Sequence, residues 1–315
     1  MNNITVCYST HRPETLGLTG RLMQDHDVII LEEPFHNDFS EVLKGNIKLK
    51  NHLLELDSGY PEFTLGQYQM LRQFSQAGKQ IVQIEPYLEH LLKVQYFLAE
   101  DHSPEEIKPN TKASAVYSAE REATGRLIDY YNEVRGDNFR KILSTMNNFA
   151  KADAARFILR DSLRVNGILK ILDLNKKTYI EAGSIHLLLP RLLGQRLSKK
   201  WHLQVHSVDR EIVKKLNQTG SLFSPGDELT LNYIWGQKVS KRKWELKCAQ
   251  TLIYSKIIMK EETLNTDEVF PHTRNEIESI SAVQTLSAED CKTLFQKIRT
   301  LKTKESVVLV KNYSK

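Results

Sequence analysis

Five acidic and imidazole side chains of this sequence stand where apolar, β-rich runs end. They are His11, Glu14, Glu33, Glu85 and His186. Imidazole and carboxylate groups gathered at one place can transfer protons to and from a substrate. The same mixture of groups can hold a divalent transition metal. The sequence therefore predicts an acid–base site formed by these five residues, with His11, Glu33 and His186 as the candidate ligands if a metal is bound.

Two adjacent acids, Glu32 and Glu33, follow the second of these runs. Neighbouring residues of an extended segment point to opposite sides, so only one of them is expected to face the site. Glu33 is the preferred candidate because Pro34 follows it, and the same order of acid and proline recurs at Glu85 and Pro86. The alternative for each Glu-Pro pair is a turn with a solvated carboxylate.

A long helical segment, residues 152–172, carries Arg156 and Arg160. Arginine binds carboxylates and phosphates through a planar pair of N–H groups, so these two residues are candidates to bind an anionic part of a substrate. The alternative is an ion pair on the helix surface, in which Arg160 pairs with a neighbouring acid and contributes about 0–1 kcal/mol.

The elements that carry these side chains follow a strand–helix–strand pattern. Strands are expected near residues 4–8, 27–31, 80–84 and 177–182, with helical spacing between them. Consecutive strands separated by helices are typical of a parallel sheet. Ligands of parallel α/β sheets bind at the carboxyl ends of the strands, so residues more than 170 positions apart are expected to meet there.

The fold class that follows is α/β, with a mostly parallel central sheet flanked by helices. Residues 1–200 are predicted to form the core and to include a polar, helical insertion at about 87–150. Residues 201–315 are predicted to form a mainly helical extension packed on the core. Within it, residues 202–208 alternate like an edge strand, and the apolar run 307–310 is interpreted as a last strand or a docking segment.

Composition indicates an ordinary globular protein. The chain has 315 residues, 40% of them hydrophobic, and three widely spaced cysteines, which argues against a secreted disulfide scaffold. No signal-peptide pattern or membrane-spanning run is present, so a cytoplasmic location without membrane association is expected. His36, His52 and His272 are interpreted as surface residues, and the oligomeric state is left open.

Charge is unevenly distributed along the chain. Residues 1–150 contain 15 basic and 21 acidic residues, which gives a net charge of −6. Residues 151–315 contain 29 basic and 18 acidic residues, which gives a net charge of +11. A basic half can favour an anionic ligand or nucleic acid. Because no nucleic-acid motif surrounds the single tight basic run at 241–243, solvated helix faces are the preferred interpretation and nucleic-acid binding is not expected.

Four segments resemble the erythromycin esterase/ChaN-like superfamily, which includes TraB and Tiki-type proteins. They are residues 8–14, 28–33, 160–166 and 179–186, whose sequences are YSTHRPE, VIILEE, RDSLRVN and YIEAGSIH. They resemble, in order, a first-strand histidine with a nearby acid, a strand-end glutamate, an Arg-Asp helix and a late strand leading to Gly-x-x-His. The second histidine that esterase members have near the late strand is replaced here by Ala182 or Gly183.

The resemblance implies a helix-flanked parallel sheet and a site formed by His11, Glu14, Glu33 and His186. The superfamily contains esterases, metal-dependent proteases and haem-associated proteins, so it does not select one activity. The leading expectation is a hydrolase of a small molecule, with or without a metal. The alternative is a protein that binds haem or another anionic ligand without catalysis.

Overall fold

A five-stranded, all-parallel sheet, built from strands between residues 2 and 207, organises the part of the molecule that carries the strand-end residues. The computed structural model describes residues 2–56, 59–219, 222–263 and 267–313. The strand order is β3-β2-β4-β1-β5. The strands are β1 (Asn2–Ser9), β2 (Val28–Leu31), β3 (Gln80–Gln83), β4 (Thr178–Gly183) and β5 (Trp201–Ser207). The expected α/β fold with a parallel sheet is confirmed.

The central strands are apolar on both faces. β4 lies between β1 and β2, where Ile180 is in register with Val6 on one side and Ile30 on the other. All three side chains are fully buried. A strand that is covered on both faces has no polar side to present, which explains the continuous apolar runs of the sequence.

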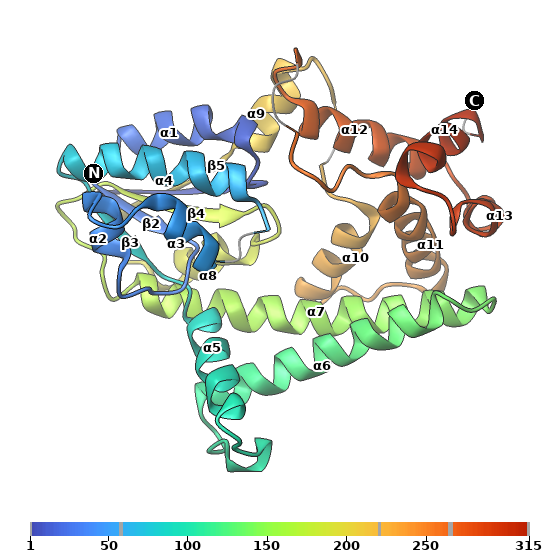
Figure 1. The fold of residues 1–315 in the computed structure, drawn as a ribbon, viewed down its shortest axis with the longest axis horizontal. Coiled ribbons are helices and arrows are strands. Elements are labelled where there is room, and N and C mark those ends of the chain that lie inside the picture. The colour runs from blue at the N-terminus through green and yellow to red at the C-terminus, as the bar shows by residue number, and fades with distance from the viewer. Residues whose placement is uncertain (1, 57–58, 220–221, 264–266, 314–315) are drawn as a thin grey trace. The chain divides into compact units, whose positions relative to one another are not determined.

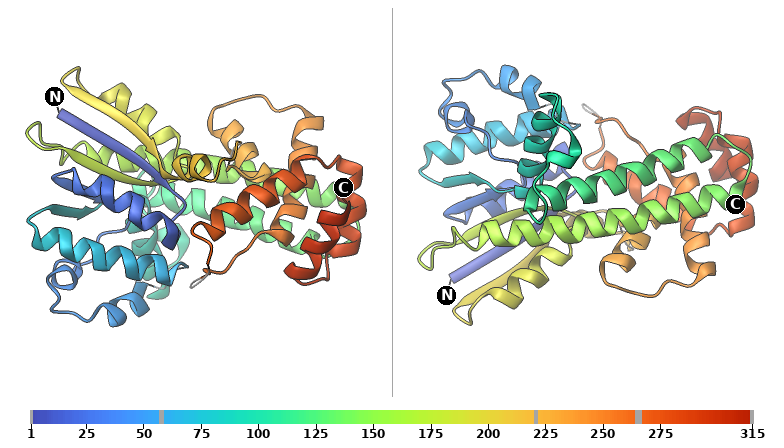
Figure 2. Two further views of the ribbon diagram at one scale, coloured as in Figure 1. Left: turned by 90° about the horizontal axis from the view of Figure 1, so that it is seen from above. Right: turned by 90° about the horizontal axis from the view of Figure 1, so that it is seen from below.

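Helices cover both faces of this sheet (Figure 1). On one face lie α1 (Leu16–Gln24) and α4 (Pro61–Gln76), which approach each other closely at Gly20 and Gly66. On the other face, the end of α7 (Phe139–Ile168) and α8 (Leu188–Arg196) pack on β1 and β4. Figure 2 shows these two helical layers from opposite sides.

Shorter helices complete the connections around the sheet. They are η1 (Pro13–Thr15), α2 (Phe39–Lys44), α3 (Leu49–Leu56), α5 (Pro86–Ala99), η2 (Pro104–Glu106) and α9 (Val208–Lys215). η1 and α5 begin with a proline, whose missing N–H is not needed in the first turn of a helix. The proline thus lets each of these two helices begin directly after the loop that follows a strand.

The chain divides into two compact units, and the division differs from the expected one. The first comprises Met1–Glu106, Leu159–Lys215 and Glu262–Phe270, and the second comprises Ile107–Ile158, Leu216–Glu261 and Pro271–Lys315. The predicted boundary at residue 200 is therefore displaced, because β5 and α9 complete the sheet unit. The predicted insertion is also divided, since α5 belongs to the first unit and α6 (Lys112–Glu133) to the second.

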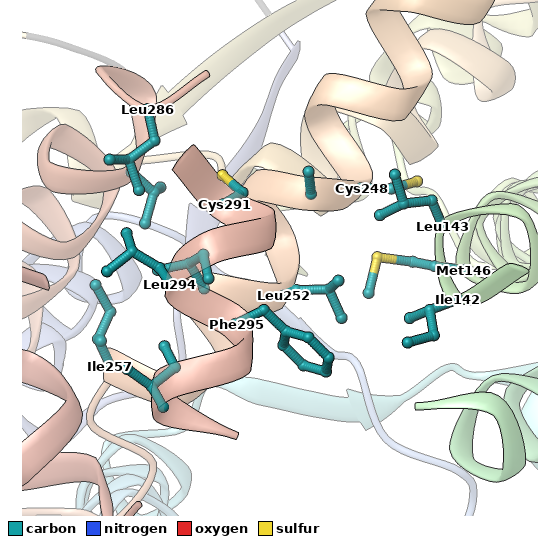
Figure 3. Packing of buried hydrophobic residues seen from close by; sticks show 14 of the residues in the cluster. Ile142, Leu143, Met146, Cys248, Leu252, Ile257, Leu286, Cys291, Leu294 and Phe295 are labelled. Carbon is teal, nitrogen blue, oxygen red and sulfur yellow. The ribbon is translucent and has the colours of Figure 1, made fainter. Parts of the chain in front are cut away.

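The second unit has a helical core of its own. Besides α6 and part of α7, its helices are α10 (Pro225–Ile234), α11 (Lys241–Ile257), α12 (Pro271–Gln284), α13 (Ala288–Ile298) and α14 (Thr303–Tyr313). Figure 3 shows Leu252 of α11 and Phe295 of α13 close to Ile142 and Met146 of α7. This core keeps the helical part of the insertion and the C-terminal helices together as one unit.

Two expectations from the sequence are wrong: that residues 307–310 form a strand, and that His52 and His272 lie on the surface. The run 307–310 is helical, because Ser306 and Val310 are buried four residues apart while Val308 is 61% exposed. His52 and His272 are buried, at 1% and 6% exposure, rather than on the surface. Across the described ranges, no helix is long and apolar enough to cross a membrane.

Candidate functional site

The carboxyl ends of the strands bring the chemically active side chains of the first unit together. His11 follows β1, Glu32 follows β2, Glu85 follows β3 and His186 follows β4. In a parallel sheet these ends lie along one edge, which is the usual place of ligand sites in α/β folds. The contacts described below join these strand ends to one another and to α7.

Glu32 is the hub of the cluster. Its carboxylate oxygens lie 2.9 Å from Arg160 Nη2, 2.9 Å from His186 Nε2 and 3.2 Å from Arg164 Nη1. One oxygen also accepts a hydrogen bond of 2.6 Å from the backbone N–H of Gly183. Burial alone would raise the pKa of Glu32, but these three cations hold it well below its usual value. Glu32 therefore remains ionised in the interior.

Arg164 joins helix α7 to three strand ends. It is fully buried, and its Nε donates to Ile84 O at 3.1 Å while its Nη2 donates to Glu181 O at 2.6 Å. Its Nη1 lies 3.2 Å from Glu32. A buried guanidinium is tolerated only when its donors are paired, so Arg164 fixes the spacing between α7 and the sheet.

Both ring nitrogens of His186 are bonded to carboxylates. Nδ1 bonds Asp161 and Nε2 bonds Glu32, and the side chain is 2% exposed. Burial would lower the pKa of His186, but Glu32 and Asp161 outweigh it and raise the pKa to about 9. His186 is thus a buried imidazolium at neutral pH, and neither nitrogen is placed to accept a proton or to bind a metal.

Glu85 is fully buried between two arginines. Its carboxylate lies 3.3 Å from Arg160 Nε and 3.8 Å from Arg164 Nε. Burial raises the pKa of Glu85, and the attraction of Arg160 and Arg164 only partly opposes it. Glu85 thus shares Arg160 with Glu32, and the guanidinium is held from two sides.

His11 is the histidine of the cluster that reaches the surface. Its backbone φ of 50° lies in the left-handed region, and its N–H bonds Ser9 Oγ at 3.3 Å. The ring packs on Phe63 at 5.2 Å between centroids, and Nε2 lies 3.9 Å from a Glu181 oxygen. The His11 side chain is 26% exposed, but its Nε2 atom is buried and has no hydrogen-bond partner among the described residues, so the ring reaches solvent through its other atoms.

Glu181 is a carboxylate inside the apolar strand β4. One oxygen accepts a hydrogen bond from Gln67 of α4, and the other accepts one of 3.1 Å from the backbone N–H of Glu32. These bonds fix the carboxylate beside His11. At 3.9 Å the Glu181 carboxylate is beyond hydrogen-bond distance of His11 Nε2, so the interaction between the two groups is electrostatic.

Glu33, the acid preferred from sequence, faces a different group of side chains. Its carboxylate accepts hydrogen bonds from Tyr68 Oη at 2.8 Å and Gln83 Nε2 at 2.9 Å. Part of the residue remains accessible, but burial of the carboxyl, with the charge of Glu181, raises the pKa of Glu33 to about 7. Glu32, rather than Glu33, contacts His186.

Gly183 leaves a space among the two histidines and Glu32. A Cβ built on Gly183 would lie 3.6 Å from His186 Cδ2, 3.7 Å from Glu32 Oε2 and 3.8 Å from His11 Cε1. These are ordinary van der Waals distances. A side chain at position 183 would therefore be about equally close to His11 and to His186.

The remaining predicted residues lie elsewhere. Arg156 belongs to the second unit, where it pairs with Glu120 and Asp153 at 3.2 and 2.5 Å. This placement does not support the expectation that Arg156 binds substrate beside Arg160. Glu14 is partly exposed in η1, after the His11 loop.

The candidate metal ligands do not form a donor set in this arrangement. Both nitrogens of His186 are bonded to carboxylates, and Glu33 is bonded to Tyr68 and Gln83. Within the described ranges no group of three His, Cys, Asp or Glu side chains has the geometry to hold a metal ion. The residues as placed therefore do not fit the proposed metal.

Four members of the cluster were not assigned to the site from the sequence: Glu32, which was weighed against Glu33 and rejected, and Asp161, Arg164 and Glu181. One signal could have found Glu181, which interrupts the apolar run Thr178–Gly183. A charged side chain on a strand that is buried on both faces must be paired, since an unpaired buried charge is very costly. Asp161 and Arg164 give no such signal, because charged residues are common on helices.

Comparison with known proteins gives one similar sequence of unestablished role. An uncharacterized protein of Archaeoglobus fulgidus is 28% identical over 291 residues, covering 92% of this chain and 97% of that protein. No protein-family model matches the chain. No solved structure matches it either.

Proposed function

We propose that this protein is a hydrolase of a small molecule and that His11 is its general base. The observation that carries the proposal is the contrast between two histidines at one edge of the sheet. His186 is enclosed and bonded at both nitrogens, whereas His11 is 26% exposed beside a fixed carboxylate. Of the two, His11 is the imidazole whose ring reaches solvent, although its Nε2 is buried, so a substrate would approach it at the exposed part of the ring.

The charge distribution supports this division of roles. Glu181 lies 3.9 Å from His11 Nε2 and stabilises the imidazolium that forms when His11 takes a proton from water. Distances of this kind are often long without substrate and shorten when it binds. His11 then returns the proton to the leaving group, so that the base is restored at the end of the cycle.

Arg160 is the candidate electrophile and anion-binding group. Its side chain is 21% exposed. Within the guanidinium, Nη2 contacts Glu32 and Nε contacts Glu85. A guanidinium has five N–H donors, so further donors remain to bind a substrate oxygen that becomes negative. His186, Arg164 and Asp161 act behind it as positioning residues, because they are too deeply buried to touch substrate.

The first prediction concerns His11→Ala. Removing a general base typically lowers the rate about 10²–10⁴-fold, so kcat/KM should fall by at least about 10²-fold. The measurement uses 4-nitrophenyl acetate and mono-4-nitrophenyl succinate, which differ in one carboxylate and therefore also report on Arg160. Melting temperature should change little, because the side chain is partly exposed and makes few bonds.

His102→Ala is the matched control, since His102 is an exposed histidine that pairs with Glu106 at 2.7 Å. Its kcat/KM should equal that of the wild type. Equal turnover by His11→Ala and the wild type would contradict the assignment of the base. A wild-type protein that hydrolyses none of a panel of ester, lactone and phosphoester probes would contradict the hydrolase.

Binding of an anionic ligand without catalysis is the second candidate. Ligand binding is favoured by Arg160 and also by Arg12, which follows His11. The Arg12 guanidinium lies over the Tyr60 ring at 4.6 Å, and its Nη1 is buried with no hydrogen-bond partner among the described residues. For haem, His186 offers no nitrogen in this arrangement, which leaves His11 as the axial ligand. A Soret band that appears on haem titration and is lost in His11→Ala, without ester hydrolysis, would favour this candidate.

A further inference from the structure

We propose that strand β5 pairs antiparallel with β5 of a second copy of this chain, about a two-fold axis at Gln204. This interface would join two five-stranded sheets into one continuous sheet. The inference is independent of the proposed function, because it concerns the edge of the sheet and not the ends of its strands.

The first observation is the position of β5. It is the last strand in the sheet order, and β1 is its only strand neighbour in the described part of the chain. Figure 2 shows it at the margin of the sheet, beside β1 (left view, yellow). An edge strand presents a row of backbone N–H and C=O groups that can pair with another chain.

The second observation is the lack of protection at this edge. Natural edge strands commonly carry lysine, proline or inward-facing charges that prevent pairing. The seven residues of β5, Trp-His-Leu-Gln-Val-His-Ser, contain no lysine, arginine, acid or proline. Val205 at its centre is 54% exposed. Because no residue of the strand is a lysine, arginine or acid, two such strands can approach without repulsion between these charged groups.

The third observation is that the strand is self-complementary. Residues His202 to His206 read His-Leu-Gln-Val-His, which is the same order of residue classes in both directions. Antiparallel pairing centred on Gln204 places Leu203 opposite Val205 of the second copy and His202 opposite its His206. A two-fold interface requires this property, because the same patch must match itself.

The two faces of β5 fit the same register. Leu203 packs toward α8, near Gly194, and Val205 shares its face of the strand. Pairing would therefore extend one apolar stripe across the axis. A cavity of about 450 Å³ is lined by Gln204, Val205 and His206 together with residues of β1 and α1, and it leaves room beside the strand for polar side chains of the second copy.

The oligomeric state tests the interface. Light scattering after size exclusion at micromolar concentration should give twice the chain mass of 36.4 kDa for the wild type. Val205→Lys should give the monomer mass, because it places two lysines close to the axis. Val308→Lys, at an equally exposed valine of α14, should remain a dimer. A monomeric wild type, or a Val205→Lys protein that stays dimeric, would overturn the proposal.

Disulfide trapping tests the register. The native cysteines are buried, and Gln204 is exposed. Gln204→Cys should form a covalent dimer on mild oxidation, because residues on the axis are about 4.5–5.5 Å apart between Cα atoms. His202→Cys alone should not, since its two copies would be about 13 Å apart. A mixture of His202→Cys and His206→Cys proteins should form the covalent heterodimer, and cross-linking of His202→Cys alone would refute this register.

Discussion

At the scale of single residues, the absence of a side chain at Gly183 matters as much as the charged groups around it. The position is surrounded by His11, Glu32 and His186 at 3.6–3.8 Å from where a Cβ would lie. We expect a reacting group that contacts both His11 and the buried cluster to lie beside this position. The second prediction follows from that geometry.

Gly183→Ala should fold normally and lose activity. The added methyl fits at van der Waals distance, but it fills the space beside His11, and a displacement of about 1 Å at a reacting centre can cost about 10²-fold in rate. We expect kcat/KM for the 4-nitrophenyl esters to fall by this order while the melting temperature changes by only a few degrees.

Gly17→Ala is the matched control, because no atom lies within 4 Å of the new methyl. It should keep full activity. If Gly183→Ala is as active as the wild type, the reacting atoms do not lie between the two histidines, and the proposed placement of the substrate is wrong.

At the scale of elements, helix α7 aligns the strand ends. Arg164 donates to the backbone of Ile84 after β3 and of Glu181 in β4, and pairs with Glu32 after β2. One side chain thus holds three strand ends at fixed spacing. The next turn of the same helix supplies Arg160 and Asp161, which contact Glu32 and His186.

The third prediction is that Arg164→Lys destabilises the fold. A lysine ammonium cannot form the forked set of bonds to Ile84, Glu181 and Glu32, so buried acceptors lose their partner. Each buried acceptor left without its donor typically costs about 1–3 kcal/mol of the free energy of unfolding. Urea denaturation followed by circular dichroism measures this loss.

Arg21→Lys provides the comparison, because Arg21 is 68% exposed and its ion pair with Glu211 is long, at 3.9 Å. Its unfolding midpoint should match that of the wild type. An Arg164→Lys protein with the same midpoint would show that Arg164 does not hold the strand ends together.

At the scale of the whole molecule, the two units alternate along the chain. Each is built from three separate segments, and the chain passes between them inside α7 at residues 158 and 159. The candidate site belongs to the first unit alone. The helical core of the second unit, centred on residues such as Leu252 and Leu294, contributes none of the charged cluster.

The fourth prediction is a loss of stability in mild alkali. The pKa of His186 is raised from 6.5 to about 9 in the fold, so the folded state holds this proton more tightly than the unfolded state. Its contribution is fully present below pH 6.5 and is lost as the pH rises toward 9. A pKa shift of this size corresponds to a contribution of about 3 kcal/mol to the free energy of unfolding. Denaturation at pH 6.5, 8 and 9.5 should reveal the decline.

His186→Asn should be less stable at pH 6.5 and should have a much flatter pH dependence over this interval. The pKa of the Glu33 carboxyl is raised to about 7, so its contribution to stability is mostly lost before pH 8. The decline between pH 8 and pH 9.5 therefore reports mainly on His186. The same slope in wild type and variant would mean that another group releases the proton.

The sequence by itself determined the class of fold and the edge at which chemistry is expected. Apolar runs of strand length separated by helical spacing specify parallel strands, and the carboxyl ends of such strands lie at one edge whatever the detailed packing. This local reasoning identified His11, Glu85, Arg160 and His186 as residues of interest. It also indicated the edge strand that became β5.

Only the tertiary structure decided which of these groups touch. The choice between Glu32 and Glu33 depends on the rotation of the chain after β2, where pairing with β4 ends at Ile30 and alternation no longer applies. The roles of the histidines depend on burial, because enclosure by Asp161 and Glu32 removes His186 from reach and leaves His11 exposed. Contacts between residues far apart in sequence set burial and charge, and local spacing carries no information about them.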